Sequence, residues 1–300
     1  MRHVKSWRYD ELMMHATNSY RELGHELGVQ LLKEYLLLHF FKEEEEEKAF
    51  EERVHQGSEH LYFLEEADVW QHFFQFHKRV GVVQPCYMLS LPVLLEAYRN
   101  RLKNASALLE EEFDWQQVRF ENGKVHYKDM SASKIVCCEG VSVRSQPFFG
   151  FLPFSLNKGE ALIVSIPDLP NDYLYLNGYK IAPWRDGLFW IGSTFEWNYT
   201  DVHPSESFRN KVIAILQNWL QLPFEIVAHL AAERPSSPDY HPYLGIHPHH
   251  PQLAVFNGQG TKGCSQTPLF ATQMKDLLLH QKPTDYEVDI TRLFKKKSNS

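Results

Sequence analysis

The fold is decided by two neighbouring stretches, RPSSPDYHPYLG at residues 234–245 and VFNGQGTKGCSQTP at residues 255–268. In the second stretch, a glycine-rich turn separates an apolar strand at residues 253–256 from a helical run at residues 265–280. At such a turn, backbone N–H groups and the helix dipole can hold an electron-rich ligand. The stretch therefore predicts a cofactor-binding loop.

The glycine spacing Gly258-Gln-Gly260-Thr-Lys-Gly263 matches the dinucleotide fingerprint G-x-G-x-x-G. That fingerprint normally opens a βαβ unit, in which an acidic residue about 20 positions later binds the ribose. Asp285 or Glu287 would take that role here. Too little chain follows Gly263 to complete such a unit, so the alternative interpretation is a tight glycine turn that caps a helix.

Taken together, the two stretches resemble the closing segment of the D-amino-acid oxidase superfamily of flavoproteins. This superfamily includes glycine oxidase, sarcosine oxidase and the oxidoreductase module of a tRNA-modifying enzyme. Further segments fall in the family's order, namely SWRYD at residues 6–10, a helix at 91–102, KIVCCEG at 134–140 and FWIGST at 189–194. The resemblance covers nearly the whole chain and implies FAD as the cofactor.

One part of the family pattern is missing from the sequence. The family opens with a strand, a GxGxxG turn and a helix that bind the ADP half of the flavin. Residues 1–6, MRHVKS, form neither an apolar strand nor a glycine turn. We therefore expect either a chain truncated at its N-terminus or a protein that has lost its normal flavin-binding half.

The order of the predicted elements indicates an α/β (α+β) fold. We expect an incomplete FAD-binding Rossmann-like domain interleaved with an antiparallel-sheet substrate domain. The FAD-binding-like region takes residues 1–28, 91–146 and 240–294, and the antiparallel region takes residues 29–90 and 147–239. Because clefts between domains are common ligand sites, the ligand is expected between the two regions.

Local patterns predict the individual elements. Asp10 and Gly28 are expected to cap the first helix, and Asn122-Gly123 and Asp186-Gly187 predict hairpin turns. Helices are expected at residues 42–54 and 204–220, with glutamates 43–47 on a solvated face or, alternatively, at an acidic docking site. Strands are expected at residues 31–41, 81–91, 107–112, 116–121, 124–128, 134–140, 160–166, 173–184, 187–193 and 226–232.

Composition excludes several classes of protein. A net charge of −7 and a pI near 6.1 argue against a nucleic-acid partner. No apolar run reaches the roughly 18 residues that span a bilayer, and four cysteines without a C-x-x-C pair favour a reducing, cytoplasmic compartment. The sequence also lacks the G-x-S-x-G, phosphate-loop lysine and HExxH motifs of common hydrolases, NTPases and zinc proteases.

The resemblance assigns the substrate contacts. Arg234 matches an arginine that pairs with the substrate carboxylate, and a guanidinium fork suits a carboxylate because it donates two parallel hydrogen bonds. The alternative is a surface ion pair between Arg234 and Glu233 or Asp239. Tyr179 lies on a strand that is expected to line the substrate side of the binding site. Its hydroxyl would there add a second contact to the substrate carboxylate.

The same resemblance assigns the cofactor contacts. Gly140 would let the end of a strand approach the flavin, although a plain turn after the strand explains it equally well. Some relatives carry an arginine in place of Thr261, which weakens the expectation of a glycine-like or D-amino-acid substrate. The loop expected against the flavin ring consists of Gly258, Gly260, Thr261, Lys262 and Gly263.

A histidine cluster invites a metal hypothesis, because neutral imidazoles are good metal ligands. The cluster consists of His241, His247, His249 and His250. No cysteine or carboxylate stands at ligand spacing, and the interleaved prolines indicate an exposed loop. We therefore expect no metal site.

The leading hypothesis is an FAD-dependent oxidoreductase that oxidises the C–N bond of a small amine or amino acid. The flavin itself would carry the chemistry, so no side chain is assigned as catalytic. The alternative is a non-catalytic remnant, a binding or scaffold protein of the same family without the nucleotide-binding half. The missing first fingerprint favours the alternative, whereas Arg234 and the 258–263 loop favour the enzyme.

Overall fold

The computed structural model describes residues 8–294, which divide into two compact units. Unit one comprises Leu32–Met88 and Lys158–Ala232. Unit two comprises, within the described residues, 8–31, Leu89–Asn157 and 233–294. The stretch MRHVKS and Trp7 of the SWRYD segment lie outside the described residues. Which region holds a flavin and which a substrate stays a prediction.

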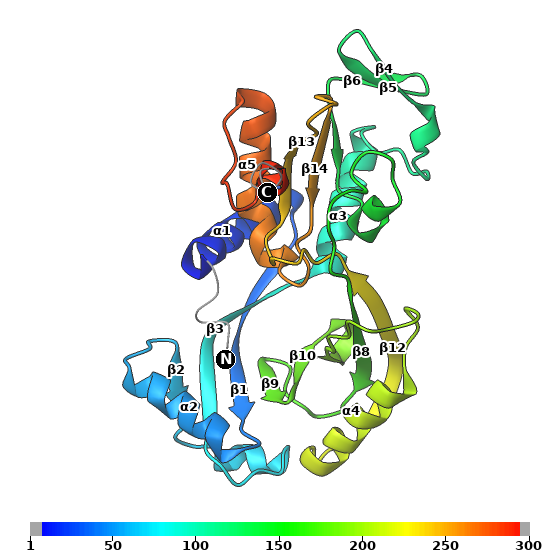
Figure 1. The fold of residues 1–300 in the computed structure, drawn as a ribbon. Helices are drawn as coiled ribbons and strands as arrows, with labels where there is room; N and C mark the ends of the chain where they lie inside the picture. The colour runs from blue at the N-terminus through cyan, green and yellow to red at the C-terminus, as the bar shows by residue number, and fades with distance from the viewer. Residues whose placement is uncertain (1–7, 295–300) are drawn as a thin grey trace. The chain divides into compact units, whose positions relative to one another are not determined.

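Unit one is built on an eight-stranded sheet with the order β12-β8-β11-β10-β9-β1-β3-β2 (Figure 1). The strands β9, β10 and β11 form an antiparallel meander and β8 pairs with β11 in antiparallel, but β1 pairs with β9 in parallel. The predicted antiparallel sheet is therefore mixed, since a long crossover separates β1 from β9. The strands are β1 (Leu32–Phe40), β2 (Leu61–Phe63), β3 (Val80–Leu89), β8 (Asn157–Ser165), β9 (Tyr173–Asn177), β10 (Tyr179–Pro183), β11 (Leu188–Gly192) and β12 (Glu225–Arg234).

Helix α4 (Glu206–Trp219) packs on this sheet (Figure 1). Its buried residues Val212, Leu216 and Trp219 recur at helical spacing and join the core formed by the strands. The helix begins where the Ser205 side chain accepts a hydrogen bond from the Phe208 N–H at 3.3 Å. Shorter elements of the unit are η2 (Asp68–His72) and η5 (Arg185–Gly187).

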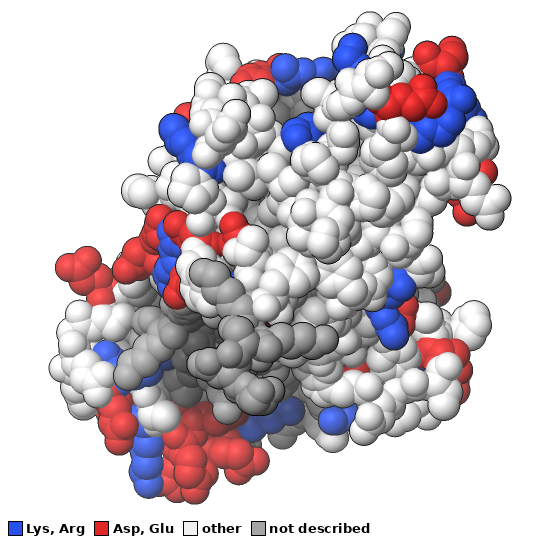
Figure 2. Space-filling view, turned by 45° about the horizontal axis from the view of Figure 1, so that its top comes forward, with Lys and Arg blue, Asp and Glu red and all other residues white. Residues whose placement is uncertain are grey.

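Helix α2 (Glu44–His55) carries the run of glutamates. Phe50 is its buried residue, Glu44 is exposed, and Lys48 pairs with Glu44 at 2.7 Å across one turn. The predicted exposure is confirmed for glutamates 43–46, and the alternative role of the run as an acidic docking site stays a prediction. On the face of the molecule drawn in Figure 2, Lys and Arg are spread among acidic residues and do not gather into one basic surface.

Two strand predictions in the sequence were wrong. Residues 173–184 form two strands, because the chain reverses at Gly178, which has a φ of 75°. The alternation of apolar residues continues through this reversal, and the Asn177-Gly178 pair, which is a hairpin signal, was overlooked. Residues 107–112 form no strand.

Unit two contains two small sheets. In the first, with the order β13-β14-β7, β14 (Leu253–Asn257) pairs with β13 (Tyr243–Ile246) in antiparallel and with β7 (Ile135–Cys137) in parallel. In the second, β4 (Val118–Glu121), β5 (Lys124–Tyr127) and β6 (Met130–Ala132) form a lobe. Its first turn uses Asn122 and Gly123 at positive φ, which confirms the predicted hairpin.

Three helices complete unit two. Helix α1 (Tyr9–Leu27) and helix α5 (Gly263–His280) lie side by side, and their apolar residues share one core (Figure 1). Helix α1 ends at Gly28 as predicted, but Arg8 and not Asp10 precedes its first turn. The remaining elements are α3 (Leu91–Asn104), η3 (Trp115–Gln117), η4 (Gly140–Arg144) and η6 (Ile290–Leu293).

The predicted fold class, helices mixed with parallel and antiparallel strands, is confirmed by these elements. Among residues 8–294, no helix is both long enough and apolar enough to cross a membrane. The cytoplasmic location stays a prediction.

Candidate cofactor site

The glycine loop connects β14 to α5, as the sequence predicts. Gly258 and Gly260 have φ values of 77° and 53°. These values lie in the left-handed region, which residues other than glycine disfavour. A Cβ at Gly258 would lie 2.8 Å from the Tyr243 ring, and one at Gly260 would lie 2.6 Å from Ser236 Oγ. Helix α5 then begins at Gly263 with no side-chain cap from the described part of the chain. Backbone conformation and close packing therefore both require glycine here.

The structure brings Gly140 next to this loop. Strands β7 and β14 run in parallel, and Gly140 and Gly258 follow their carboxyl ends. Asn257 joins the two ends, because its Nδ2 donates to the Gly140 carbonyl at 2.9 Å and its Oδ1 accepts from the Gly258 N–H at 2.7 Å. Ligands of α/β sheets bind outside the carboxyl ends of the strands. The paired ends of β7 and β14 are thus the candidate site.

A chain of hydrogen bonds links Arg234 to the same loop. Arg234 Nη1 donates to Asn157 Oδ1 at 2.8 Å, and Asn157 Nδ2 donates to Ser236 Oγ at 2.9 Å. The Gly260 N–H in turn donates to the Pro235 carbonyl at 3.1 Å. Burial lowers the pKa of Arg234. The guanidinium is therefore partly desolvated and held at the edge of the loop.

Asp239 was the alternative surface partner for Arg234. Its carboxylate is instead bound by Arg292, whose Nε lies 3.2 Å from Asp239 Oδ2.

The described residues of this site fit the polar edge of a flavin. A Cβ added to Gly140 would meet no atom within 4 Å, so space is open beside the strand end. The N–H groups at the uncapped start of α5 favour a partly negative group. Two buried acceptor atoms, Glu139 Oε2 and Gln266 Oε1, have no hydrogen-bond partner among residues 8–294. A ligand with carbonyl oxygens and with N–H or O–H donors would satisfy both sets of groups.

Of the loop side chains that the sequence singles out, Thr261 is exposed and Lys262 is half-buried at the start of α5. Tyr179 lies in the other unit, on β10. Its ring meets the Phe208 ring of α4 edge-on, with 5.5 Å between the centroids. Its role as a substrate contact stays a prediction.

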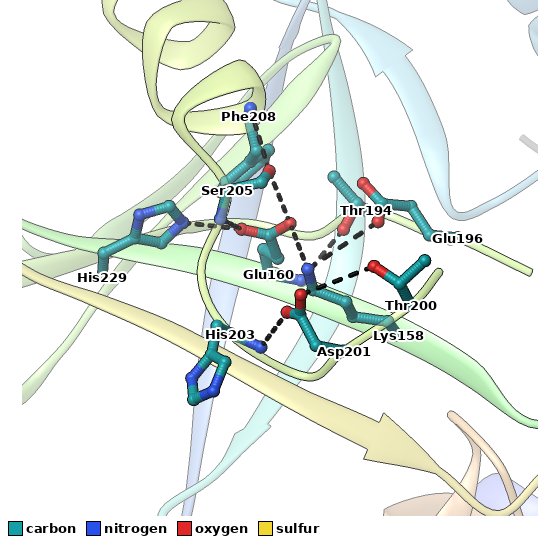
Figure 3. Close-up of polar contacts among 10 residues, drawn as sticks. All are labelled: Lys158, Glu160, Thr194, Glu196, Thr200, Asp201, His203, Ser205, Phe208 and His229. Atoms are coloured by element: carbon teal, nitrogen blue, oxygen red, sulfur yellow. Dashed lines mark hydrogen bonds and ion pairs between the residues drawn. The ribbon is translucent and has the colours of Figure 1, made fainter. Parts of the chain in front are cut away.

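A second polar cluster lies in unit one and was missed by the sequence analysis (Figure 3). Its centre is the fully buried carboxylate of Glu160 on β8. Ser205, at the start of α4, donates to this carboxylate from its N–H at 2.6 Å and from its Oγ at 2.8 Å. Lys158 Nζ lies 3.3 Å from Glu160 Oε1, and His229 Nε2 on β12 lies 2.8 Å from Glu160 Oε2.

This cluster keeps Glu160 ionised. Burial raises the pKa of Glu160, but hydrogen bonds from Ser205 and Lys158 outweigh burial and leave the pKa below its ordinary value. The backbone of Glu160 also binds Thr194, whose Oγ1 accepts from the Glu160 N–H at 2.9 Å. The cluster therefore ties α4, the edge strand β12 and the segment after β11 to β8.

In the histidine cluster, the His247 ring makes hydrogen bonds to the backbone of its neighbours. Its Nδ1 accepts from the N–H groups of His249 and His250 at 3.2 and 3.1 Å, so its Nε2 is the protonated nitrogen and donates to the Phe148 carbonyl at 3.1 Å. Both ring nitrogens of His247 are thus occupied by the backbone. In residues 8–294, no three His, Cys, Asp or Glu side chains are grouped to hold a metal ion.

Comparison with known proteins identifies the family and the fold. A family model described as FAD dependent oxidoreductase matches residues 2–277. Glycine oxidase of Pseudomonas putida is 31% identical over 138 residues, which are 44% of this chain and 37% of that protein. The match thus spans little more than a third of the curated relative's length.

Solved structures with this fold include two glycine oxidases. The enzyme from Geobacillus kaustophilus gives a TM-score of 0.74 at 21% identity, over 93% of this chain and 81% of that chain. The enzyme from Bacillus cereus gives 0.75 at 18% identity, over 92% and 81%. NikD, an unusual amino acid oxidase of nikkomycin biosynthesis, gives 0.73 at 17% identity, over 98% and 84%. At these identities the likeness establishes the fold.

Proposed function

Because this chain belongs to the FAD-dependent oxidoreductase family, whose members use FAD, we propose that it oxidises the C–N bond of a small amine or amino acid. When bound, FAD would supply the oxidant, which takes a hydride from the carbon next to the nitrogen. The observation that carries the proposal is the junction of Gly140, Asn257 and Gly258 at the carboxyl ends of β7 and β14.

The chain's own residues would hold and orient the reactants. The N–H groups at the start of α5 would face the electron-rich edge of the flavin, and Gly140 would let the cofactor approach the end of β7. Asn257 keeps the two strand ends together, as its two hydrogen bonds show. Arg234 would bind the carboxylate of an amino-acid substrate, with its guanidinium positioned by Asn157.

The cofactor site is tested by comparing Gly140→Ala with Gly123→Ala. Both glycines have a positive φ and open space where a Cβ would stand, so each change should cost about 1 kcal/mol of stability. The added methyl at residue 140 enters the proposed flavin site, whereas residue 123 lies in the β4–β5 turn. We expect Gly140→Ala alone to weaken FAD binding, by about 10-fold or more.

The measurement is a titration of the purified chain with FAD, followed by calorimetry and by the visible absorption of protein freed of unbound flavin. Equal FAD affinities for the two variants would remove Gly140 from the site. A wild-type chain that stays folded and binds no FAD would contradict the proposed function and support the non-catalytic alternative.

The carboxylate contact is tested by Arg234→Ala. Hydrogen bonds from a charged group contribute about 1.5–3 kcal/mol, so KM for a carboxylated substrate should rise about 10- to 100-fold. The amide of the same amino acid lacks the negative charge and serves as the matched substrate, for which KM should change little. An equal rise in KM for the acid and for its amide would show that Arg234 does not recognise the carboxylate.

A further inference from the structure

Glu139 stands at the end of β7, directly before Gly140, and was not among the residues expected at the site. Its Oε1 accepts a hydrogen bond from Trp115 Nε1 at 3.0 Å. Its Oε2 is buried and accepts no hydrogen bond from residues 8–294. A buried acceptor without a donor lowers stability unless a further group satisfies it. The carboxylate therefore has capacity for one more donor.

The segment η3, which leads directly into β4 and is counted here with the β4–β6 lobe, fixes the orientation of this carboxylate. Trp115 begins η3, which is capped by Asp114, whose Oδ1 accepts from the Gln116 N–H at 2.9 Å. The Trp115 ring packs against the rings of Phe113 and Phe148, at centroid distances of 4.9 and 5.3 Å. The indole N–H is thus aimed at Glu139 by packing on two sides. With one oxygen held in this way, the second oxygen keeps a fixed position.

The surroundings indicate what kind of group this oxygen would meet. Gly140 follows Glu139, borders open space and is joined to the glycine loop through Asn257. A carboxylate repels phosphate oxygens but accepts hydrogen bonds from hydroxyl groups, and acidic residues at strand ends of dinucleotide-binding folds bind sugar hydroxyls in this way. FAD contains hydroxyl groups in its ribityl chain and in its ribose.

We infer that Glu139 binds a hydroxyl group of FAD through Oε2, and that the β4–β6 lobe positions the carboxylate for this contact through Trp115. The inference rests on the proposed function, since it takes FAD as the ligand. It adds a polar recognition residue to a site that otherwise consists mainly of glycines and backbone groups. It also gives the lobe a role in cofactor binding.

The test is the affinity of the full chain for FAD and for riboflavin, measured by calorimetry for the wild type and four variants. Glu139→Ala should weaken FAD binding about 10- to 100-fold, the range for a hydrogen bond to a charged acceptor. Glu139→Gln keeps an acceptor oxygen and should recover part of the loss. Trp115→Phe should cause a smaller, several-fold loss, because it frees the carboxylate without removing it. Glu121→Gln, an exposed glutamate of β4, is the matched control and should bind as the wild type does.

A merely structural role predicts a different pattern, in which Glu139→Ala lowers the thermal stability of the flavin-free chain. Glu139→Ala removes the unsatisfied Oε2 but also the acceptor of the Trp115 N–H, and because these two effects have opposite signs we expect that stability to change little. Riboflavin distinguishes the two hydroxyl sources: an equal loss for riboflavin and FAD assigns the ribityl chain, and a loss for FAD alone assigns the ribose.

Two results would overturn the inference. Unchanged or tighter FAD binding by Glu139→Ala would show that the carboxylate faces no hydroxyl, and tighter binding would place it near the phosphates instead. This result leaves the proposed function intact, because the wild type still binds FAD. A folded wild-type chain that binds neither flavin would overturn both.

Discussion

Glu160→Ala is expected to destabilise the chain by about 3–5 kcal/mol, the usual cost of removing one partner of a buried ion pair. The substitution leaves the Lys158 ammonium, which is nearly inaccessible to solvent, without its close carboxylate at 3.3 Å. It also removes the acceptor for the Ser205 N–H and Oγ at the start of α4. Urea unfolding followed by circular dichroism measures the loss.

Glu196→Ala is the matched control for this prediction. Glu196 also faces Lys158, but at 4.0 Å and with its side chain 37% exposed, so its removal should cost no more than about 1 kcal/mol. Glu160→Gln preserves the shape of the side chain and removes its charge, and it should fall between the two alanine variants. If Glu160→Ala and Glu196→Ala unfold at the same urea concentration, Glu160 is not the centre of the cluster.

The second large effect is a loss of stability in acid that originates at His39. This side chain is buried on β1, with its ring centroid 4.3 Å from that of Phe41, and burial lowers its pKa from 6.5 to about 4. The unfolded chain therefore binds a proton on His39 at a higher pH than the folded chain does. The stabilisation is fully present above pH 6.5 and is lost as the pH falls to about 4, which amounts to about 3 kcal/mol.

The measurement is the free energy of unfolding at pH 7 and at pH 4.5, for the wild type and for His39→Leu. Leucine has a similar size and cannot be protonated, so the variant should lose about 2–3 kcal/mol less than the wild type over this interval. Carboxylates also titrate in this range, but they do so in both proteins and cancel in the comparison. If the free energy of unfolding falls equally in both proteins between pH 7 and pH 4.5, His39 is protonated as easily in the folded chain as in the unfolded one.

Much of the secondary structure was predictable because residues at turns and helix ends determine it locally. Asn122-Gly123 and Asp186-Gly187 adopt the positive φ values that hairpin turns require. Gly28 ends the first helix with a φ of 68°, and Pro92 lies in the first turn of α3. Each of these residues acts on its immediate neighbours, so no tertiary information was needed.

The candidate site was predictable only in part. The spacing of the glycines at 258, 260 and 263 predicts the loop. The contact of Asn257 with Gly140 could not be predicted in this way, because Gly140 lies 117 positions away in the chain. The Glu160 cluster draws Lys158, Ser205 and His229 from two strands and the start of a helix, and no motif connects them. A charged residue such as Glu160 inside a strand of apolar residues was the one available signal.

The reversal at Gly178 was missed although Asn177-Gly178 is a local hairpin signal, because the apolar alternation outweighed it in the prediction. The apolar alternation of residues 173–184 is compatible with one long strand or with two short ones. Pairing of Tyr179 with Asn177, and of Ile181 with Tyr175, selects the hairpin. These contacts become visible once the strand is placed in its sheet.

The division of the chain between the two units has a consequence for its synthesis. The chain passes from one unit to the other near residues 31, 88, 157 and 232, so neither unit is a continuous sequence. Unit one can close once β12 has left the ribosome, but α1 packs against α5, which is made more than 230 residues later. The apolar side of α1 therefore stays uncovered until α5 has been made. During that interval of synthesis, the exposed apolar side of α1 is the kind of surface that chaperones bind.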